Sequence, residues 1–113
     1  MMGVTIFSIS DVHTMGIKEV LSDAIAIASN GTAGIHLSFD MDALDPDNAP
    51  GVGTPVLNGL TNREGFMICE ALYNSGKLLA IDMVETNPLL DDRNTTGRLA
   101  SELILTCLGK TSY

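Results

Sequence analysis

Three carboxylates follow apolar runs of the sequence, at places where they could bind a divalent cation. Asp40 and Asp42 come directly after the run 34–39, and Glu85 follows the run 78–84. If the chain stays extended, the side chains of Asp40 and Asp42 project to the same side. Two carboxylates that face one point resist burial unless a cation or amide donors compensate their charge. Their hard oxygen atoms suit magnesium, calcium or manganese.

A turn gives a second explanation of the same aspartates. Asp40 could cap a turn, and Asp42 or Asp45 could form an Asx-turn before Pro46, which is a routine use of aspartate in loops. The Asp-x-Asp doublet alone favours this explanation. The metal site gains weight from the position of the doublet, at a predicted strand end beside the loop 41–60, which is rich in glycine and proline.

Apolar periodicity predicts strands and helices that alternate along the chain. The expected strands are 4–9, 34–39 and 78–84, and the expected helices begin near Ile17, Thr61 and the segment before Leu99. Thr61 and Glu64 have the spacing of a capping box. The order βαβαβα with right-handed crossovers predicts an α/β fold, a three-layer αβα arrangement around a parallel sheet, as a single domain over residues 1–113.

Composition argues against nucleic acid and membranes as partners. Six basic and fourteen acidic residues give a net charge of −8, which repels phosphate backbones and anionic lipid. No run has the length and apolarity of a membrane span, and no charged signal region opens the chain. Cys69 and Cys107 lie in apolar helical patterns without further ligands at metal spacing. We expect two core thiols in a reducing, cytoplasmic compartment.

The segment Ser38–Pro46, SFDMDALDP, resembles the signature of the ureohydrolase family, which includes arginases and agmatinases, around its last metal-binding strand. The likeness continues through Ala49–Val56, APGVGTPV, and resumes at Asp82–Pro88, DMVETNP. Asp91–Thr96 resembles bacterial arginases in particular. The resemblance covers essentially the whole chain and implies the C-terminal part of an arginase-like fold.

The resemblance also implies a chemistry and a role for each site residue. In that family two manganese ions activate a hydroxide, which attacks the guanidinium carbon of arginine or a related compound and leads to loss of urea. Asp40 would bridge both ions and Asp42 would ligate one of them. Glu85 would receive the guanidinium group of the substrate, a planar cation that suits a carboxylate. Thr54 matches a position near that group.

Other ligands of the family have no counterpart in these 113 residues, namely a histidine on an earlier strand and an Asp-Ala-His-x-x-x-Asp block. The general-acid histidine has none either. His36 lies inside an apolar strand, where we expect a structural core residue, and His13 lies in the first loop. Two carboxylates cannot hold two divalent ions against water. We therefore expect weak or no manganese binding and no hydrolysis by the isolated chain.

Two further expectations concern assembly. Unpaired strand edges and an apolar face predict a homo-oligomer, and the alternative to an enzyme segment is a stand-alone α/β module that self-associates or binds a cation or guanidino compound without catalysis. Arg63 and Glu64 open a helix, where they either cap it and meet solvent or, by resemblance, lie near a trimer interface. The remaining acidic residues, Asp91, Asp92 and Glu102, are expected on solvated surfaces.

Overall fold

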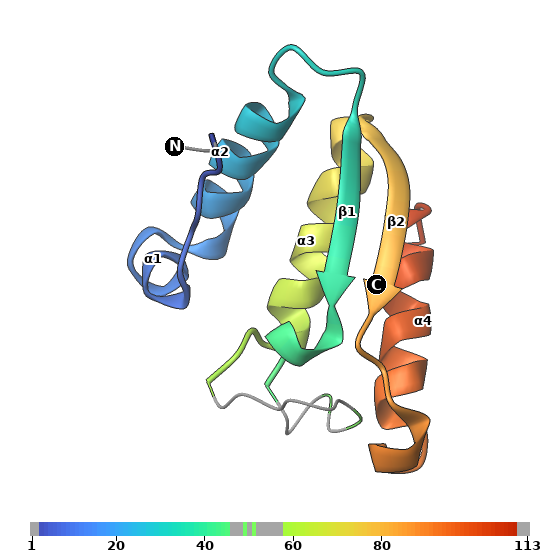
Figure 1. Cartoon of the computed structure of the whole chain (residues 1–113). Helices are drawn as coiled ribbons and strands as arrows, with labels where there is room; N and C mark the ends of the chain where they lie inside the picture. The colour runs from blue at the N-terminus through green and yellow to red at the C-terminus, as the bar shows by residue number, and fades with distance from the viewer. Residues whose placement is uncertain (1–2, 46–48, 50, 52–57, 111–113) are drawn as a thin grey trace.

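The computed structural model describes residues 3–45, 49, 51 and 58–110 (Figure 1). Two helices open the described chain, and a β-α-β unit and a last helix follow them. The elements are α1 (Ile9–Met15), α2 (Ile17–Ser29), β1 (Ile35–Asp40), the 3-10 turn η1 (Met41–Ala43), α3 (Asn62–Ser75), β2 (Leu78–Val84), the 3-10 turn η2 (Pro88–Leu90) and α4 (Thr95–Cys107).

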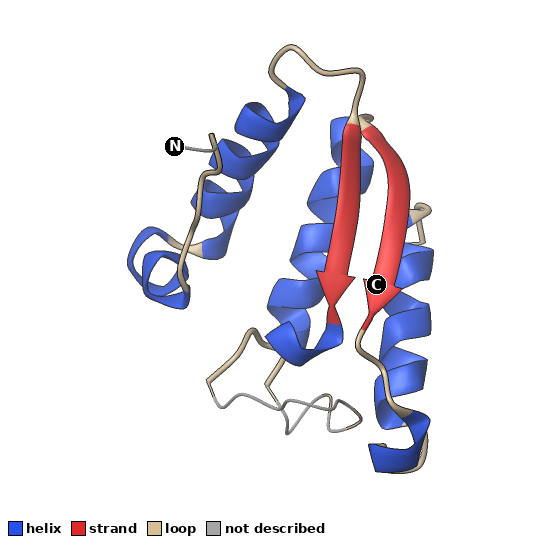
Figure 2. Ribbon diagram, viewed as in Figure 1, coloured by secondary structure: helices blue, strands red, loops and turns tan. Residues whose placement is uncertain are grey.

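Strands β1 and β2 form a parallel two-stranded sheet in the described part of the chain, joined through helix α3 (Figure 2). In the register of the pair, His36 lies opposite Ala80 and Asp40 opposite Val84. The carboxyl ends of the two strands therefore meet at one edge of the sheet. The segments that follow β1 and β2 both leave from this edge, where ligand sites of parallel sheets lie.

Most of the predicted elements are confirmed. Strands 34–39 and 78–84 and all three helices form where expected, and the α/β class with helices that flank a parallel sheet is confirmed. Helix α3 begins with the predicted capping box, in which the Thr61 hydroxyl accepts from the Glu64 amide at 3.1 Å and the Glu64 carboxylate accepts from the Thr61 amide at 3.0 Å.

The predicted first strand, 4–9, is wrong. Residues 3–7 have no regular structure, and Val4 and Ile6 are 72% and 81% exposed. A strand needs a neighbour for its backbone hydrogen bonds, and no described segment pairs with this one. A helix begins instead at Ile9, because Ser8 and Asp11 form a capping box there.

Helices α3 and α4 pack against each other and against one face of the sheet (Figure 1). The core lies between them and includes Phe39 of β1, Leu44 after η1 and Leu103 of α4. Gly65 of α3 permits the close approach, since a Cβ there would lie 3.3 Å from Leu44 Cδ2. Helix α2 packs beside α3. No described helix combines the length and apolarity that crossing a bilayer requires.

Candidate functional site

Asp40 and Asp42 lie at the carboxyl end of β1. Asp40 is the last residue of the strand, and its Oδ1 accepts a hydrogen bond from the Asp42 amide at 3.0 Å. Asp42 belongs to the 3-10 turn η1, which the fully buried Met41 anchors in the core. The chain is thus not extended at Asp42, so the argument from strand alternation is wrong there. The capping role that the sequence offered as an alternative is confirmed for Asp40.

The carboxylates nevertheless act on one another electrostatically. Burial raises the pKa of Asp40, and the charges of Asp42 and Glu85 raise it further, whereas the hydrogen bond from the Asp42 amide lowers it. The net shift is upward. A carboxylate in such surroundings favours a nearby positive charge, because a cation would offset both the burial and the repulsion.

Glu85 follows directly after β2 and neighbours Val84, which pairs with Asp40. Its backbone is left-handed, with φ of 65°, a conformation that is uncommon for residues other than glycine. The chain therefore turns sharply as soon as the strand ends. This turn, together with the register of the sheet, puts Glu85 at the same edge as Asp40 and Asp42.

Gly51 connects the loop after β1 to the loop after β2. Its amide donates to Thr96 Oγ1 at 2.7 Å, and its carbonyl accepts from the Asn87 amide at 2.6 Å. Thr96 is fully buried at the start of α4. A glycine is needed because a Cβ at this position would lie 2.5 Å from Asp91 Cγ. The two loops are thus fastened to α4 and to each other.

Asp91 organises the second loop from a partly exposed position, a role that the sequence did not predict. Its carboxylate accepts hydrogen bonds from the amides of Thr96 at 3.0 Å, Gly97 at 3.1 Å and Asp92 at 3.0 Å. Partial burial raises the pKa of Asp91, but these hydrogen bonds outweigh it and hold the pKa below its usual range. An aspartate shortly before a helix start is a recognisable signal for such a role.

The first loop closes at its base through backbone hydrogen bonds. The Asp45 amide donates to the Leu60 carbonyl at 2.9 Å, and the Leu60 amide donates to the Ala43 carbonyl at 2.8 Å. Asp45 Oδ2 also accepts from the Asn58 amide at 3.1 Å, across the loop. Thr54, the predicted neighbour of the substrate, lies outside the described residues.

His36 is not a core residue, so that expectation is wrong. Its side chain is 55% exposed, and Nε2 lies 2.8 Å from Asp82 Oδ2 on β2. Residues alternate between the two faces of a strand, and His36 points away from the face that packs on α3 and α4. His13 lies in α1 rather than in a loop and is exposed.

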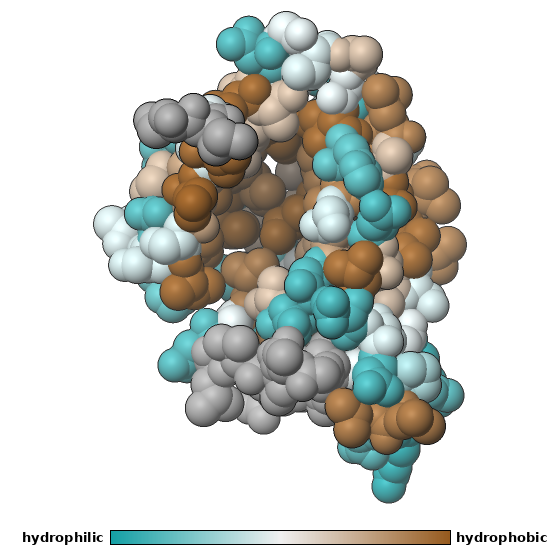
Figure 3. Space-filling model, in the orientation of Figure 1, coloured by the Kyte–Doolittle hydropathy of each residue, from teal (hydrophilic) through white to brown (hydrophobic). Residues whose placement is uncertain are grey.

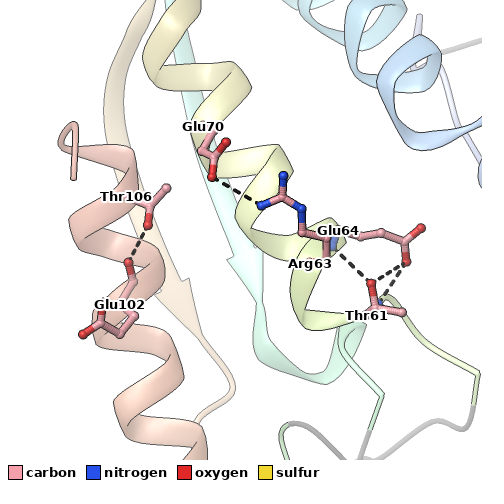
Figure 4. A network of polar contacts seen from close by, with 6 residues as sticks. All are labelled: Thr61, Arg63, Glu64, Glu70, Glu102 and Thr106. Carbon is pink, nitrogen blue, oxygen red and sulfur yellow. Dashed lines mark hydrogen bonds and ion pairs between the residues drawn. The ribbon is translucent and has the colours of Figure 1, made fainter. Parts of the chain in front are cut away.

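The start of α3 carries the other predicted charges (Figure 4). Glu64 serves the capping box with Thr61, and Arg63 Nη1 lies 3.8 Å from Glu70 Oε1 on the same helix. Glu102 is exposed on α4, as expected, and its carboxylate pairs with Lys110 at 2.7 Å.

A family model described as the arginase family matches residues 1–109. The chain belongs to the arginase family. An arginase of Bacillus subtilis is 40% identical over 108 residues, which are 96% of this chain and 36% of the relative. An arginase of Emericella nidulans is 47% identical over 111 residues, which are 96% of this chain and 34% of the relative. The chain thus spans about a third of the relatives that it matches.

Solved arginases share the fold. The native structure of the arginase of Bacillus caldovelox superposes with a TM-score of 0.94 at 40% identity, over 98% of this chain and 37% of the other. The chain is therefore similar to a part of that larger arginase structure. The sequence blocks around Asp40 and Glu85 predict this family, and the family match confirms the prediction.

The carboxylates fit part of a site for a hard divalent cation. Asp40 and Asp42 offer hard oxygen ligands next to each other, and the raised pKa of Asp40 indicates a place where positive charge is favoured. Among the described residues, however, no group of three or more histidine, cysteine, aspartate or glutamate side chains is arranged to hold a metal ion. The described residues can therefore supply a share of the ligands.

Proposed function

We propose that this chain supplies part of the active site of a manganese-dependent hydrolase that acts on a guanidino compound, arginine in the first place. The observation that carries the proposal is the meeting of Asp40, Asp42 and Glu85 at the carboxyl edge of two paired parallel strands. Ligand sites of open α/β sheets lie at this edge. Family membership then suggests the reaction, since the matched relatives are named arginases.

The proposed roles are those that the resemblance to the ureohydrolase family implies for these residues. Asp40 and Asp42 would be among the ligands that hold the manganese ions. Glu85 would accept hydrogen bonds from the guanidinium group of the substrate, and Thr54 would lie near that group. Bound manganese would supply the Lewis acidity that lets water attack the guanidinium carbon at neutral pH. The loop fastened at Gly51 would hold these residues in place.

The site would be completed by protein outside these 113 residues. We propose that the chain corresponds to the C-terminal part of an arginase and that the isolated chain is inactive. The share of the relatives that it spans, 36% for the Bacillus subtilis protein, supports this proposal. So does the incomplete ligand set of the described residues.

The surface that would receive the rest of the fold is an open apolar hollow beside β1. Figure 3 shows apolar residues gathered around it. The hollow has a volume of about 560 Å³, and its lining includes Phe7, Val12, Val20, Leu60 and Ile68. The hollow lies between the opening segment, α2 and the loop after β1. Further strands and helices of the same domain would fit there, because they would cover apolar surface that otherwise contacts water.

A second candidate is a stand-alone module in which two copies of the chain cover these surfaces for each other. The exposed apolar side chains favour it, notably Val4, Ile6 and Leu89, which are 72%, 81% and 94% exposed. Self-association would also fit the homo-oligomer that the sequence predicts. This module would lie in the cytoplasm, with no nucleic acid or membrane as partner.

Urea release from arginine distinguishes the two candidates. The 113-residue protein would be assayed with manganese, alone and together with the part of the Bacillus subtilis arginase that it does not match. We expect no activity alone and activity after reconstitution, lost in Asp40→Asn but kept in Asp23→Asn, a matched change on the exposed face of α2. Reconstitution that forms a complex of the two parts without urea release would overturn the enzyme proposal and favour the module.

A further inference from the structure

The turn between helix α2 and strand β1 carries an asparagine followed by a glycine. Asn30 comes directly after the end of α2, and both Asn30 and Gly31 are exposed. Gly31 has a positive φ of 69°, and a Cβ built there would have no atom within 4 Å. Among the described residues, no hydrogen bond holds the Asn30 side chain or the Gly31 amide. The peptide unit between the two residues is therefore uncrowded and open to water.

We propose that Asn30 is a modification site, at which the chain itself converts the side-chain amide into a carboxylate, mainly as isoaspartate. The nucleophile is the backbone nitrogen of Gly31, which can reach Asn30 Cγ and close a succinimide ring. Glycine favours this step because it has no side chain to hinder the nitrogen and because its backbone turns easily. The site stands independently of the proposed hydrolase function.

Ring closure requires the Asn30–Gly31 peptide unit to rotate, since the backbone of Asn30 is extended with ψ of 111°. The hydrogen bond that spans the two residues, from the Thr32 amide to the Ser29 carbonyl, is 3.5 Å long and therefore weak. The next strong contact is the hydrogen bond from the Ile35 amide to a carbonyl of the segment before β2, at 2.7 Å. The turn can thus rearrange without loss of the strand pair.

The chain holds a second asparagine-glycine pair, Asn58–Gly59, which the fold protects. The Asn58 amide donates to Asp45 Oδ2 at 3.1 Å, and the Leu60 amide donates to the Ala43 carbonyl at 2.8 Å. Gly59 is closely packed between these contacts, since a Cβ there would lie 2.6 Å from the Ala43 carbonyl oxygen. Ring closure at Asn58 therefore requires the base of the loop to open first.

The reaction balances with water as the co-reactant. The Gly31 nitrogen loses its proton to a base and forms a bond to Asn30 Cγ, the bond from Cγ to the side-chain nitrogen breaks, and that nitrogen leaves as ammonia. Water then opens the succinimide. Attack at the backbone carbonyl carbon of Asn30 gives isoaspartate, and attack at Cγ gives aspartate. One asparagine and one water thus give one carboxylic acid and one ammonia.

Both products place a carboxylate at the C-terminal end of α2. The last turn of this helix has no basic residue to pair with it. Negative charge at a helix C-terminus is unfavourable, because it lies next to the carbonyl groups of the last turn. We therefore expect the modified protein to bind an anion exchanger more tightly and to unfold at a lower urea concentration than the unmodified protein.

Incubation of the whole 113-residue protein in mildly alkaline buffer tests the proposal. A protease that cuts before aspartate separates the two asparagines, Asn30 in the peptide Asp23–Phe39 and Asn58 in the peptide Asp47–Ile81. In the folded protein, mass spectrometry should show Asn30 converted at least about tenfold faster than Asn58, because Asn58 must wait for local opening. Aspartate creates a new cut in the first peptide, whereas isoaspartate leaves that peptide whole with a carboxyl group in place of the amide.

Two controls separate the effect of the fold from that of the dipeptide. In concentrated urea, Asn30 and Asn58 should react at similar rates, since each precedes a glycine. Gly31→Ala should slow the conversion of Asn30, because the added methyl group hinders the attacking nitrogen, and should leave the conversion of Asn58 unchanged.

Three results would overturn the proposal. The first is equal conversion of Asn30 and Asn58 in the folded protein, which would mean that the fold does not select the site. The second is an unmodified Asn30 after an incubation that converts it in the unfolded chain. The third is aspartate without isoaspartate, which would mean direct hydrolysis instead of ring closure. The wild-type protein in buffer and in urea is enough to obtain each result, even if Gly31→Ala does not fold.

Discussion

Alanine at Gly51 should destabilise the protein because the site has no room for a Cβ. That atom would lie 2.5 Å from Asp91 Cγ and 2.6 Å from Asp91 Cβ. Asp91 cannot retreat freely, since its carboxylate accepts hydrogen bonds from the amides of Thr96 and Gly97. The backbone of Gly51 is also held, by Thr96 Oγ1 at 2.7 Å and by the Asn87 amide at 2.6 Å. Either the loop or the carboxylate must move.

The size of the effect follows from these two ways of relieving the clash. Extra atoms in a packed site cost about 1–3 kcal/mol when neighbours shift. Displacing Asp91 instead loses hydrogen bonds to a charged acceptor, each of which contributes about 1.5–3 kcal/mol. We therefore expect Gly51→Ala to lower the free energy of unfolding by about 2–4 kcal/mol, a large share of the stability of a typical domain.

Equilibrium unfolding in urea, followed by circular dichroism, measures this change. Gly97→Ala is the matched control, because a Cβ there would meet Asp91 Oδ2 at an ordinary 4.0 Å, and alanine in helix α4 should stabilise by up to about 1 kcal/mol. The double variant Gly51→Ala with Asp91→Ala should lose less than the sum of the single losses. A Gly51→Ala protein within about 0.5 kcal/mol of wild type would refute the reasoning.

Three further predictions concern single contacts. The fold lowers the pKa of Asp91, so the ionised carboxylate should stabilise the protein above the pKa of the unfolded state, about 3.9. This contribution should be lost as the pH falls through the lower pKa of the folded state. The urea midpoints of wild type and Asp91→Asn should therefore converge at low pH. Thr61→Ala removes the capping box of α3 and should lower the free energy of unfolding by about 1 kcal/mol in urea titrations. His36→Ala should lower it by no more than about 1 kcal/mol in the same assay, because the His36–Asp82 pair is exposed; a loss of several kcal/mol would mean a buried role.

Local sequence signals predicted the elements that are stabilised locally. Strand 78–84, the helices and the Thr61 capping box formed as expected, since periodicity and end signals act within one element. The prediction of a strand at 4–9 was wrong because a strand also needs a neighbouring strand for its backbone hydrogen bonds, and an apolar run alone does not provide one. The prediction that His36 is a core residue was wrong for a related reason. The sequence pattern of a strand does not show which of its two faces other elements will cover.

The candidate site was predicted in outline but not in its local geometry. The positions of Asp40 and Glu85 at neighbouring strand ends followed from the order of the elements and from the register of the sheet. The 3-10 turn at Asp42 was not foreseen as the main geometry, because the doublet fits both an extended chain and a turn. The role of Asp91 was missed because it depends on amides of a helix that begins several residues later.

Manganese binding by the reconstituted assembly tests the central claim most directly. The 113-residue protein would be combined with the unmatched part of the Bacillus subtilis arginase, and free manganese would be followed by electron paramagnetic resonance during titration. Binding should be tight in the wild-type and Asp23→Asn assemblies and at least about tenfold weaker in Asp40→Asn and Asp42→Asn. Equal manganese affinity in all four assemblies would contradict the account, because Asp40 and Asp42 would then not be ligands.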